Sequence, residues 1–326
     1  MTQGLLKVAF VFAAAVGSCL GHVGTLESNC ELERKRAVLA SLHTVLNTFL
    51  SHWICRLNSG IYCKTGRDGR PYSEGRPFFA GSDGDWAVSG HSGESLEQTN
   101  FLFEVATSIS PRQICEVGFN AGHSALTLLV GAGSNSSYVG FDWSILNPGL
   151  NEELFRMIRD WLPSNNMTIV WGDADPGIRA FLLQGGGGIC ELTVFDGPHD
   201  VLQVLKFMPL LRVMAKRSRP FLLLDDVGCT AAICHHSTLA WRFLLWLGMV
   251  SPISCRVALR HAAGEMGACL GRFQWGKVLR CHTFDARCVA RTLGMVEQLQ
   301  RERWIGCCLV AAAQAKPDAY LVQIQI

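Results

Sequence analysis

An acidic, glycine-rich turn is the clearest candidate for chemistry in this chain. Within Gln113–Ala125 the frame ExGxxxGxSA places Glu116 two residues before Gly118, with Gly122 and Ser124 further along. The frame differs from the dinucleotide pattern GxGxxG, whose turn holds a pyrophosphate. A carboxylate beside the turn favours a ligand that carries a cation, and glycines let the backbone approach that ligand closely. S-adenosylmethionine (SAM) fits, because it has an ammonium and a sulfonium and no phosphate. The alternative is an ordinary strand–turn–helix with a buried glutamate.

Further acids follow the next expected strands, and ligands of an open parallel sheet bind at the carboxyl ends of its strands. Asp142 stands 24 residues after Gly118 and could accept both ribose hydroxyls. Asp173, or Asp175 in the same GDAD segment, could accept from the adenine amino group. The residues expected to bind the cofactor are therefore Glu116, Gly118, Asn120, Gly122, Ser124, Asp142 and Asp173.

Three carboxylates at the ends of the fourth and fifth expected strands predict a metal site. Asp196 lies in FDGPHD, and Asp225 and Asp226 lie in LLLDDV. Carboxylates brought together repel each other unless a cation is present. Oxygen ligands of this kind suit Mg²⁺, or else Mn²⁺ or Ca²⁺. The alternative is that the FDGPHD segment is a turn with a helix-capping residue.

These motifs, in this order, resemble those of the class I SAM-dependent methyltransferases. Within that class they are most similar to the metal-dependent O-methyltransferases of the catechol O-methyltransferase type, over roughly Glu94 to Lys277. Asn120 stands where many class I enzymes have glycine, and asparagine tolerates a left-handed backbone. In the O-methyltransferases a lysine three residues after the first metal-binding aspartate takes the substrate proton. Here that position is His199, which can act as a base near neutral pH.

The resemblance implies methyl transfer from SAM to a small hydroxylated acceptor, such as a sugar or a phenolic diol. The metal would lower the pKa of the acceptor hydroxyl, and His199 or solvent would remove its proton. His199 and Asp196 are the expected catalytic residues. Two other hypotheses stay open: a binding protein that keeps a degenerate methyltransferase fold, and a nucleotide-dependent oxidoreductase, which the missing GxGxxG pattern disfavours.

The alternation of strands and helices from Glu94 onward predicts an α/β fold: a Rossmann-like class I methyltransferase sheet, mostly parallel, with helices on both faces. Apolar runs give the expected strands: Gln113–Gly118, Tyr138–Asp142, Thr168–Gly172, Glu191–Phe195, Phe221–Leu224, and a final pair at Ile253–Leu259 and Arg272–Val278. Helical periodicity gives the expected helices: Glu31–Leu57, His123–Val130, Glu152–Leu162, Pro176–Leu183, Val201–Ala215, which Pro209 should kink or break, and Thr238–Leu247.

Four segments are expected along the chain: a signal peptide or short anchor (1–21), an N-terminal helix with a loop-rich segment (22–93), the SAM-binding methyltransferase domain (94–280) and a C-terminal extension (281–326). Lys7 precedes nine apolar residues, Val8–Val16, and small residues follow, which is typical of a signal peptide. We therefore expect a secretory or extracellular location, with a membrane anchor as the alternative. A secretory enzyme would need SAM imported into its compartment.

The composition of the chain limits the kinds of partner that we expect it to bind. The net charge of +2 argues against a nucleic-acid-binding surface and leaves a small-molecule acceptor as the expected partner. A membrane partner is expected only if the N-terminal segment is retained, and the oligomeric state stays open. Cys115 and Cys190 lie in or beside central strands and are expected to be buried thiols. Asn135 and Asn166 begin N-glycosylation sequons and are expected in exposed loops.

Overall fold

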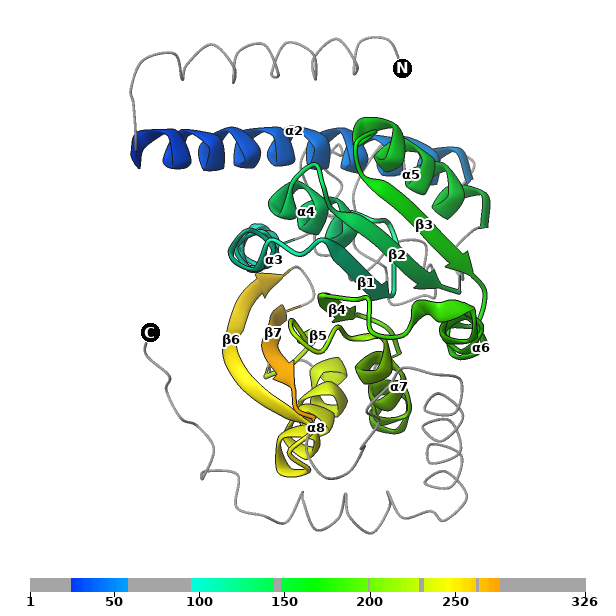
Figure 1. The fold of residues 1–326 in the computed structure, drawn as a ribbon. Coiled ribbons are helices and arrows are strands. Elements are labelled where there is room, and N and C mark those ends of the chain that lie inside the picture. Colours follow the sequence, from blue (N-terminus) through cyan, green and yellow to red (C-terminus); the bar gives the residue numbers. More distant parts are fainter. Residues whose placement is uncertain are drawn as a thin grey trace.

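A seven-stranded sheet forms the centre of the chain. The computed structural model describes residues 25–57, 95–143, 148–198, 200–228, 232–261 and 264–275. The strands lie in the order β3-β2-β1-β4-β5-β7-β6; the first five are parallel, and β7 is antiparallel to both of its neighbours (Figure 1). Their bounds are β1 Gln113–Val117, β2 Ser137–Asp142, β3 Asn166–Trp171, β4 Leu192–Phe195, β5 Phe221–Asp225, β6 Val250–His261 and β7 Gly264–Phe273. The predicted Rossmann-like sheet is confirmed.

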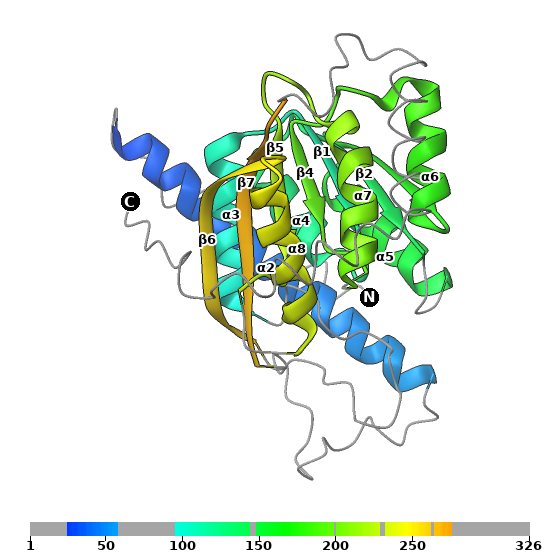
Figure 2. The same ribbon diagram turned by 90° about the horizontal axis from the view of Figure 1, so that it is seen from below.

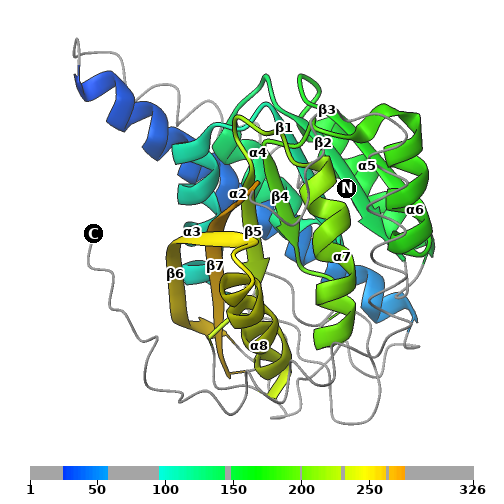
Figure 3. The ribbon, with the colours of Figure 1, turned by 60° about the horizontal axis from the view of Figure 1, so that its bottom comes forward.

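Helices cover both faces of the sheet, because the parallel strands are joined by crossover helices. One face carries α2 (Thr25–Leu57), α3 (Leu96–Ile109), α4 (His123–Ala132) and α5 (Pro148–Trp161) (Figure 1, Figure 2). The other carries α6 (Ala174–Phe181) with its continuation Leu182–Gly186, α7 (Val201–Met214) and α8 (Ala232–Trp246). Figure 3 shows α7 and α8 in front of β4 and β5. Alternate strand residues enter the two cores: Ile114 and Leu223 on the α4 side, Val117 and Leu224 on the α7 side.

Helix α3 begins with a serine N-cap and was not expected from the sequence. Ser95 has extended backbone, and its Oγ accepts a hydrogen bond from the N–H of Gln98 at 3.1 Å. The helix then buries Phe101, Leu102 and other apolar side chains against the sheet. The pattern Ser-x-x-Gln before an apolar run was the available signal.

Two expectations about the later elements are wrong. Pro209 does not break helix α7, which runs from Val201 to Met214 with buried apolar side chains, including Met208 and Leu210, on both sides of the proline; a kink at Pro209 stays a prediction. The last strand of the described part of the chain is Gly264–Phe273 instead of Arg272–Val278, since β6 extends to His261 and pairs antiparallel with β7 up to Gly264. The long pairing of β6 with β7 has two irregularities of register, which hide the simple alternation that marks a strand.

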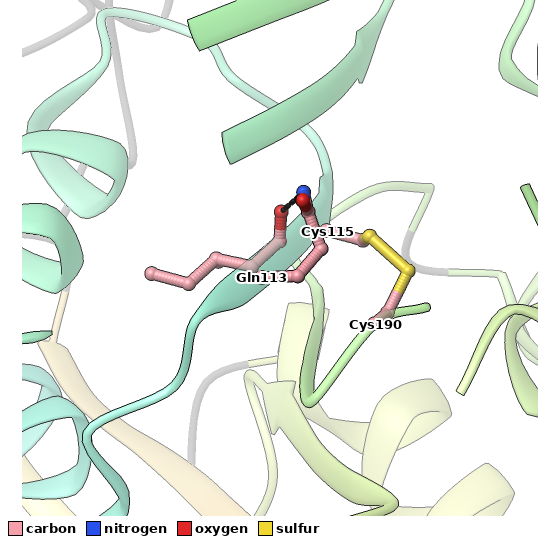
Figure 4. The surroundings of a disulfide bond; sticks show 4 residues. Gln113, Cys115 and Cys190 are labelled. Carbon is pink, nitrogen blue, oxygen red and sulfur yellow. Dashed lines mark hydrogen bonds between the residues drawn. A yellow bond between two sulfur atoms is a disulfide. The ribbon is translucent and has the colours of Figure 1, made fainter. Parts of the chain in front are cut away.

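Cys115 and Cys190 form a disulfide, so the expectation of buried thiols is wrong (Figure 4). Cys115 lies in β1, and Cys190 lies just before the neighbouring strand β4, with 5.8 Å between the Cα atoms. Seventy-five residues separate the two cysteines in sequence, so only the folded sheet brings them together. Cys255 and Cys269, opposite each other on β6 and β7, form another disulfide.

Several expectations fall outside the described residues: the segment 1–21, the loop-rich part of 22–93, the extension 281–326 and His199. Within the described part of the chain, no helix is long and apolar enough to cross a membrane. Asn135 and Asn166 are both exposed, Asn135 in the loop before β2 and Asn166 as the first residue of the edge strand β3.

Candidate functional site

The acids predicted at the strand ends lie in one row across the carboxyl edge of the sheet. Val117 pairs with Phe141 on one side and Phe195 on the other, and Phe195 pairs with Leu224. One residue further along each strand, the row therefore runs Asp142, Gly118, Asp196, Asp225. The glycine turn thus lies between an acid from β2 and an acid from β4. The expected cofactor residues and the expected metal ligands are therefore neighbours along one edge of the sheet.

The turn between β1 and α4 is built from left-handed residues. Gly118, Asn120 and Gly122 have φ of 97°, 47° and 79°. A Cβ on Gly118 would lie 1.9 Å from the carbonyl oxygen of Asp196, and one on Gly122 would lie 2.5 Å from the Ile158 side chain in α5. Both glycines are therefore required by the approach of neighbouring chain segments, whatever the ligand requires.

Asp142 holds this turn in place. Its Oδ2 accepts hydrogen bonds from the backbone N–H groups of Phe119 and Asn120, both at 2.7 Å. On the other side of the turn, the Nδ2 of Asn151 in α5 donates to the carbonyl oxygen of Asn120 at 3.0 Å. Hydrogen bonds to an ionised acceptor are the stronger kind, so the carboxylate is a structural support for the turn as well as a candidate ribose ligand.

Glu116 points into the interior. Its side chain is fully buried, and its Oε2 accepts a hydrogen bond from the Tyr138 hydroxyl on β2 at 2.5 Å. Burial raises the pKa of Glu116 from 4.5 to about 7, against the lowering effect of the hydrogen bonds from Tyr138 and Ser124. Its other oxygen, Oε1, has no hydrogen-bond partner among the described residues. A ligand cation, such as the ammonium of SAM, would therefore have to extend from the turn into the interior to contact Glu116.

Asp196, Asp225 and Asp226 interact strongly with one another. Asp225 and Asp226 are buried at 8% and 3% exposure, and Asp196 is partly exposed. Loss of solvation, followed by the neighbouring carboxylates, raises the pKa of Asp196 and of Asp225 well above the usual range. The Nε2 of Gln98 at the start of α3 donates to Asp225 Oδ2 at 2.7 Å, while Asp225 Oδ1 has no hydrogen-bond partner among the described residues.

The three aspartates supply oxygen ligands of the kind that a divalent cation prefers. Their oxygens are hard ligands, and the unpartnered Oδ1 of Asp225 together with the mutual repulsion would be relieved by positive charge. However, the described residues contain no group of three His, Cys, Asp or Glu side chains placed to hold one metal ion. The predicted metal site is therefore not confirmed, and the side chains would have to turn toward a common centre to form it.

The remaining predicted residues lie near the same edge. Ser124 is buried in the first turn of α4. Asp173 is exposed and caps α6 by accepting from the N–H of Asp175 at 3.1 Å. Asp175 itself is paired with Arg179 and Lys206, each at 2.6 Å, which leaves Asp173 as the acid of this segment available to a ligand.

Two residues of the site were missed in the sequence, Gln98 and Tyr138. Gln98 precedes the first strand by a whole helix, and only the folding of α3 against the sheet brings it to Asp225. Tyr138 lies in β2 directly beside Glu116's strand, where its pairing partner is Ile114. The signal in the sequence was a tyrosine among the apolar residues of a strand expected at the centre of the sheet.

No protein-family model and no curated protein matches the sequence. Solved structures do resemble the fold. Cofactor-bound Rv0187 from MTB is 17% identical with a TM-score of 0.46, over 55% of this chain and 80% of that one. The O-methyltransferase from Bacillus cereus in complex with SAH is 15% identical with a TM-score of 0.43, over 55% and 82%. The O-methyltransferase TomG from Streptomyces achromogenes in complex with SAM is 16% identical with a TM-score of 0.42, over 55% and 81%. At these identities the likeness extends to the fold alone.

Proposed function

We propose that the protein is a SAM-dependent O-methyltransferase that acts on a small hydroxylated acceptor, a sugar or a phenolic diol. The observation that carries the proposal is the row Asp142, Gly118, Asp196, Asp225 at the carboxyl edge. One end of the row supports a glycine turn suited to a cationic cofactor, and the other end gathers carboxylates beside it. SAM carries a net positive charge, so its binding would relieve the repulsion among these acids.

SAM would bind at the carboxyl ends of β1 to β3. Asp142, whose Oδ2 accepts two hydrogen bonds from the turn, is also the residue proposed to accept from the ribose hydroxyls. Gly118, Asn120, Gly122 and Ser124 would surround the methionine portion of SAM, with Glu116 beneath it, and Asp173 would accept from the adenine amino group. Such placement brings the methyl group toward Asp196, since Gly118 lies directly beside Asp196.

Methyl transfer would take place at the carboxyl ends of β4 and β5. The acceptor oxygen attacks the methyl carbon of the sulfonium; a C–O bond forms, the C–S bond breaks, and its electron pair stays on sulfur. We propose His199, three residues after Asp196, as the group that takes the hydroxyl proton. Asp196, Asp225 and Asp226 would hold a divalent cation, which would supply Lewis-acid polarisation of the acceptor hydroxyl when bound.

Binding and turnover test the two halves separately. Calorimetry with SAM and with its demethylated product should give saturable binding, and methyl transfer to a panel of diols and catechols should fall in EDTA and recover with Mg²⁺. Full transfer in EDTA would remove the metal from the proposal. Binding of SAM without transfer to any acceptor would favour the degenerate binding protein. Absence of SAM binding would refute both.

We also propose a secretory location. The Cys115–Cys190 and Cys255–Cys269 disulfides support it, because disulfides persist in oxidising compartments. The exposed sequon residues Asn135 and Asn166 lie at the edge of the sheet opposite the acids, where a glycan would not obstruct the proposed site. Expression in a secretory eukaryotic host should yield a chain that has lost its first 18 to 22 residues and that shifts in mass on treatment with an N-glycosidase. A cytosolic chain beginning at Met1 or Thr2, with free thiols, would contradict this location.

A further inference from the structure

Helix α2 runs antiparallel along α4 and contacts it through polar groups at three levels. The Nζ of Lys35 donates to the carbonyl oxygen of Gly131, at 3.4 Å, near the end of α4. His43 contacts Thr127 in the middle, and Asn47 contacts His123 at the first residue of α4. Later residues of α2 therefore contact earlier residues of α4, and the last of these contacts lies next to the turn that precedes α4.

The two contacts nearest the turn both involve His123, one directly and one through Thr127. The His123 ring is 1% exposed, and its Nε2–H donates to Asn47 Oδ1 at 2.7 Å. The Thr127 hydroxyl donates to the backbone carbonyl of His123 at 2.7 Å, so its oxygen is the acceptor for His43 Nε2–H at 2.9 Å. The rings of His43 and His123 lie 5.2 Å apart. Residues of α2 thus hold both the side chain and, through Thr127, the backbone of His123.

His123 directly follows Gly122, the last left-handed residue of the turn. Ile158 and the Phe119 ring pack against Gly122 where a side chain would otherwise lie. The first turn of α4 is also joined to it by the bond from the N–H of Leu126 to the carbonyl of Gly122 at 2.9 Å. A displacement of His123 would therefore be transmitted to the turn.

We propose that Asn47 is a positioning residue for the cofactor turn: its bond to His123 fixes the first turn of α4 and with it the residues that would hold SAM. The inference rests on the proposed SAM binding. Helix α2, which is neither a strand of the sheet nor a crossover helix, would then contribute to the affinity for the cofactor. By thermodynamic reciprocity, cofactor binding must then also strengthen the attachment of α2.

The test compares four full-length chains by calorimetry with the demethylated product of SAM. Asn47→Ala removes the acceptor of one part-buried hydrogen bond and should raise Kd roughly threefold to tenfold. Asn47→Asp keeps an acceptor oxygen at that position and should restore most of the affinity. Thr44→Ala is the matched control, because Thr44 is exposed on the same helix and its hydroxyl donates to the carbonyl of Ala40 within α2. Its Kd should equal that of the wild type. In steady state, Asn47→Ala should raise KM for SAM while kcat at saturating SAM changes little.

Hydrogen exchange on the wild-type chain gives a second measurement that needs no variant. Addition of the demethylated product should slow amide exchange around residue 47 of α2 as well as in the turn. If the wild type binds and neither Asn47→Ala affinity nor α2 exchange changes, the inference is wrong while the proposed function stands. Equal weakening in Asn47→Ala and Asn47→Asp would also overturn it. A wild type that binds no SAM refutes the proposed function instead.

Discussion

The hydroxyl of Tyr138 donates to the fully buried carboxyl of Glu116 across two neighbouring strands, at 2.5 Å. Glu116 stands two residues before Gly118, where the turn proposed to receive SAM begins. Burial raises the pKa of Glu116 to about 7, so the carboxyl changes charge near neutral pH. Because the folded state holds this proton more tightly than the unfolded chain does, Glu116 contributes stability below pH 4.5, and that contribution is lost as the pH rises to about 7.

Tyr138→Phe should therefore destabilise the protein more at pH 8 than at pH 5.5. At pH 8 the Glu116 carboxylate would be buried without its donor, at a cost of about 1–3 kcal/mol. Urea denaturation at the two pH values measures the difference. Glu116→Gln is the control, because it removes the titrating group and should flatten this part of the pH dependence. Equal losses for Tyr138→Phe at both pH values would contradict a charged partner.

Asp142→Ala should weaken SAM binding by more than Asp142→Asn. Asparagine keeps an acceptor oxygen for the N–H groups of Phe119 and Asn120, whereas alanine releases the turn and removes the ribose ligand together. Loss of charge-assisted hydrogen bonds predicts about 1.5–3 kcal/mol for the alanine variant. Calorimetry with the demethylated product reads the two affinities. Identical affinities for alanine, asparagine and wild type would mean that Asp142 serves neither the turn nor the ribose.

Replacing Gln98 with Met should reduce methyl transfer while leaving SAM affinity close to that of the wild type. The change removes the donor to Asp225 Oδ2, at the end of the row distant from β2 and β3. The kcat with the best acceptor and the calorimetric Kd for SAM together separate the two effects. A loss of SAM affinity equal to the loss of kcat would show that Gln98 supports the fold of the whole edge instead.

The buried His43 should make the protein sensitive to acid. Burial lowers the pKa of His43 from 6.5 to about 4, so the folded state keeps the ring neutral where the unfolded chain binds a proton. Stability should therefore fall as the pH drops from 6.5 toward 4, by up to about 1.4 kcal/mol per pH unit. His43→Gln should reduce this slope in urea denaturation. Thr44→Ala, at an exposed position of α2 with no titrating side chain, should leave the slope unchanged.

Loss of the Cys115–Cys190 disulfide should cost more stability than loss of Cys255–Cys269. Their sequence separations are 75 and 14 residues, and the longer loop restricts the unfolded chain more. The loop-entropy relation gives about 4 kcal/mol for the first and about 3 kcal/mol for the second. Paired Cys→Ala variants compared by urea denaturation test the order. The reverse order would show that strain or packing outweighs chain entropy here.

Most of the strands and the crossover helices could be predicted from the sequence, because strands buried on both faces are continuous apolar runs and helices carry a 3.6-residue period. β1, β2 and β4 match their expected ranges within one residue. Helix α3 and the true position of β7 were missed. Helix α3 begins at a serine N-cap, and β7 pairs with β6 over an irregular register.

The sequence by itself determined the glycine turn and the acid at the end of each strand, because both follow from residue type and from the rule that parallel strands present their carboxyl ends together. It could not decide what those acids contact. Only the tertiary structure places Asp142 on the turn's amides, Glu116 against Tyr138, and Gln98 on Asp225 from 127 residues away. The disulfide between Cys115 and Cys190 and the attachment of α2 to His123 belong to the same class. The physical reason is distance along the chain: a local pattern fixes which element a residue joins, but the partner of a buried polar group is chosen when separate elements pack and its lost hydration must be replaced.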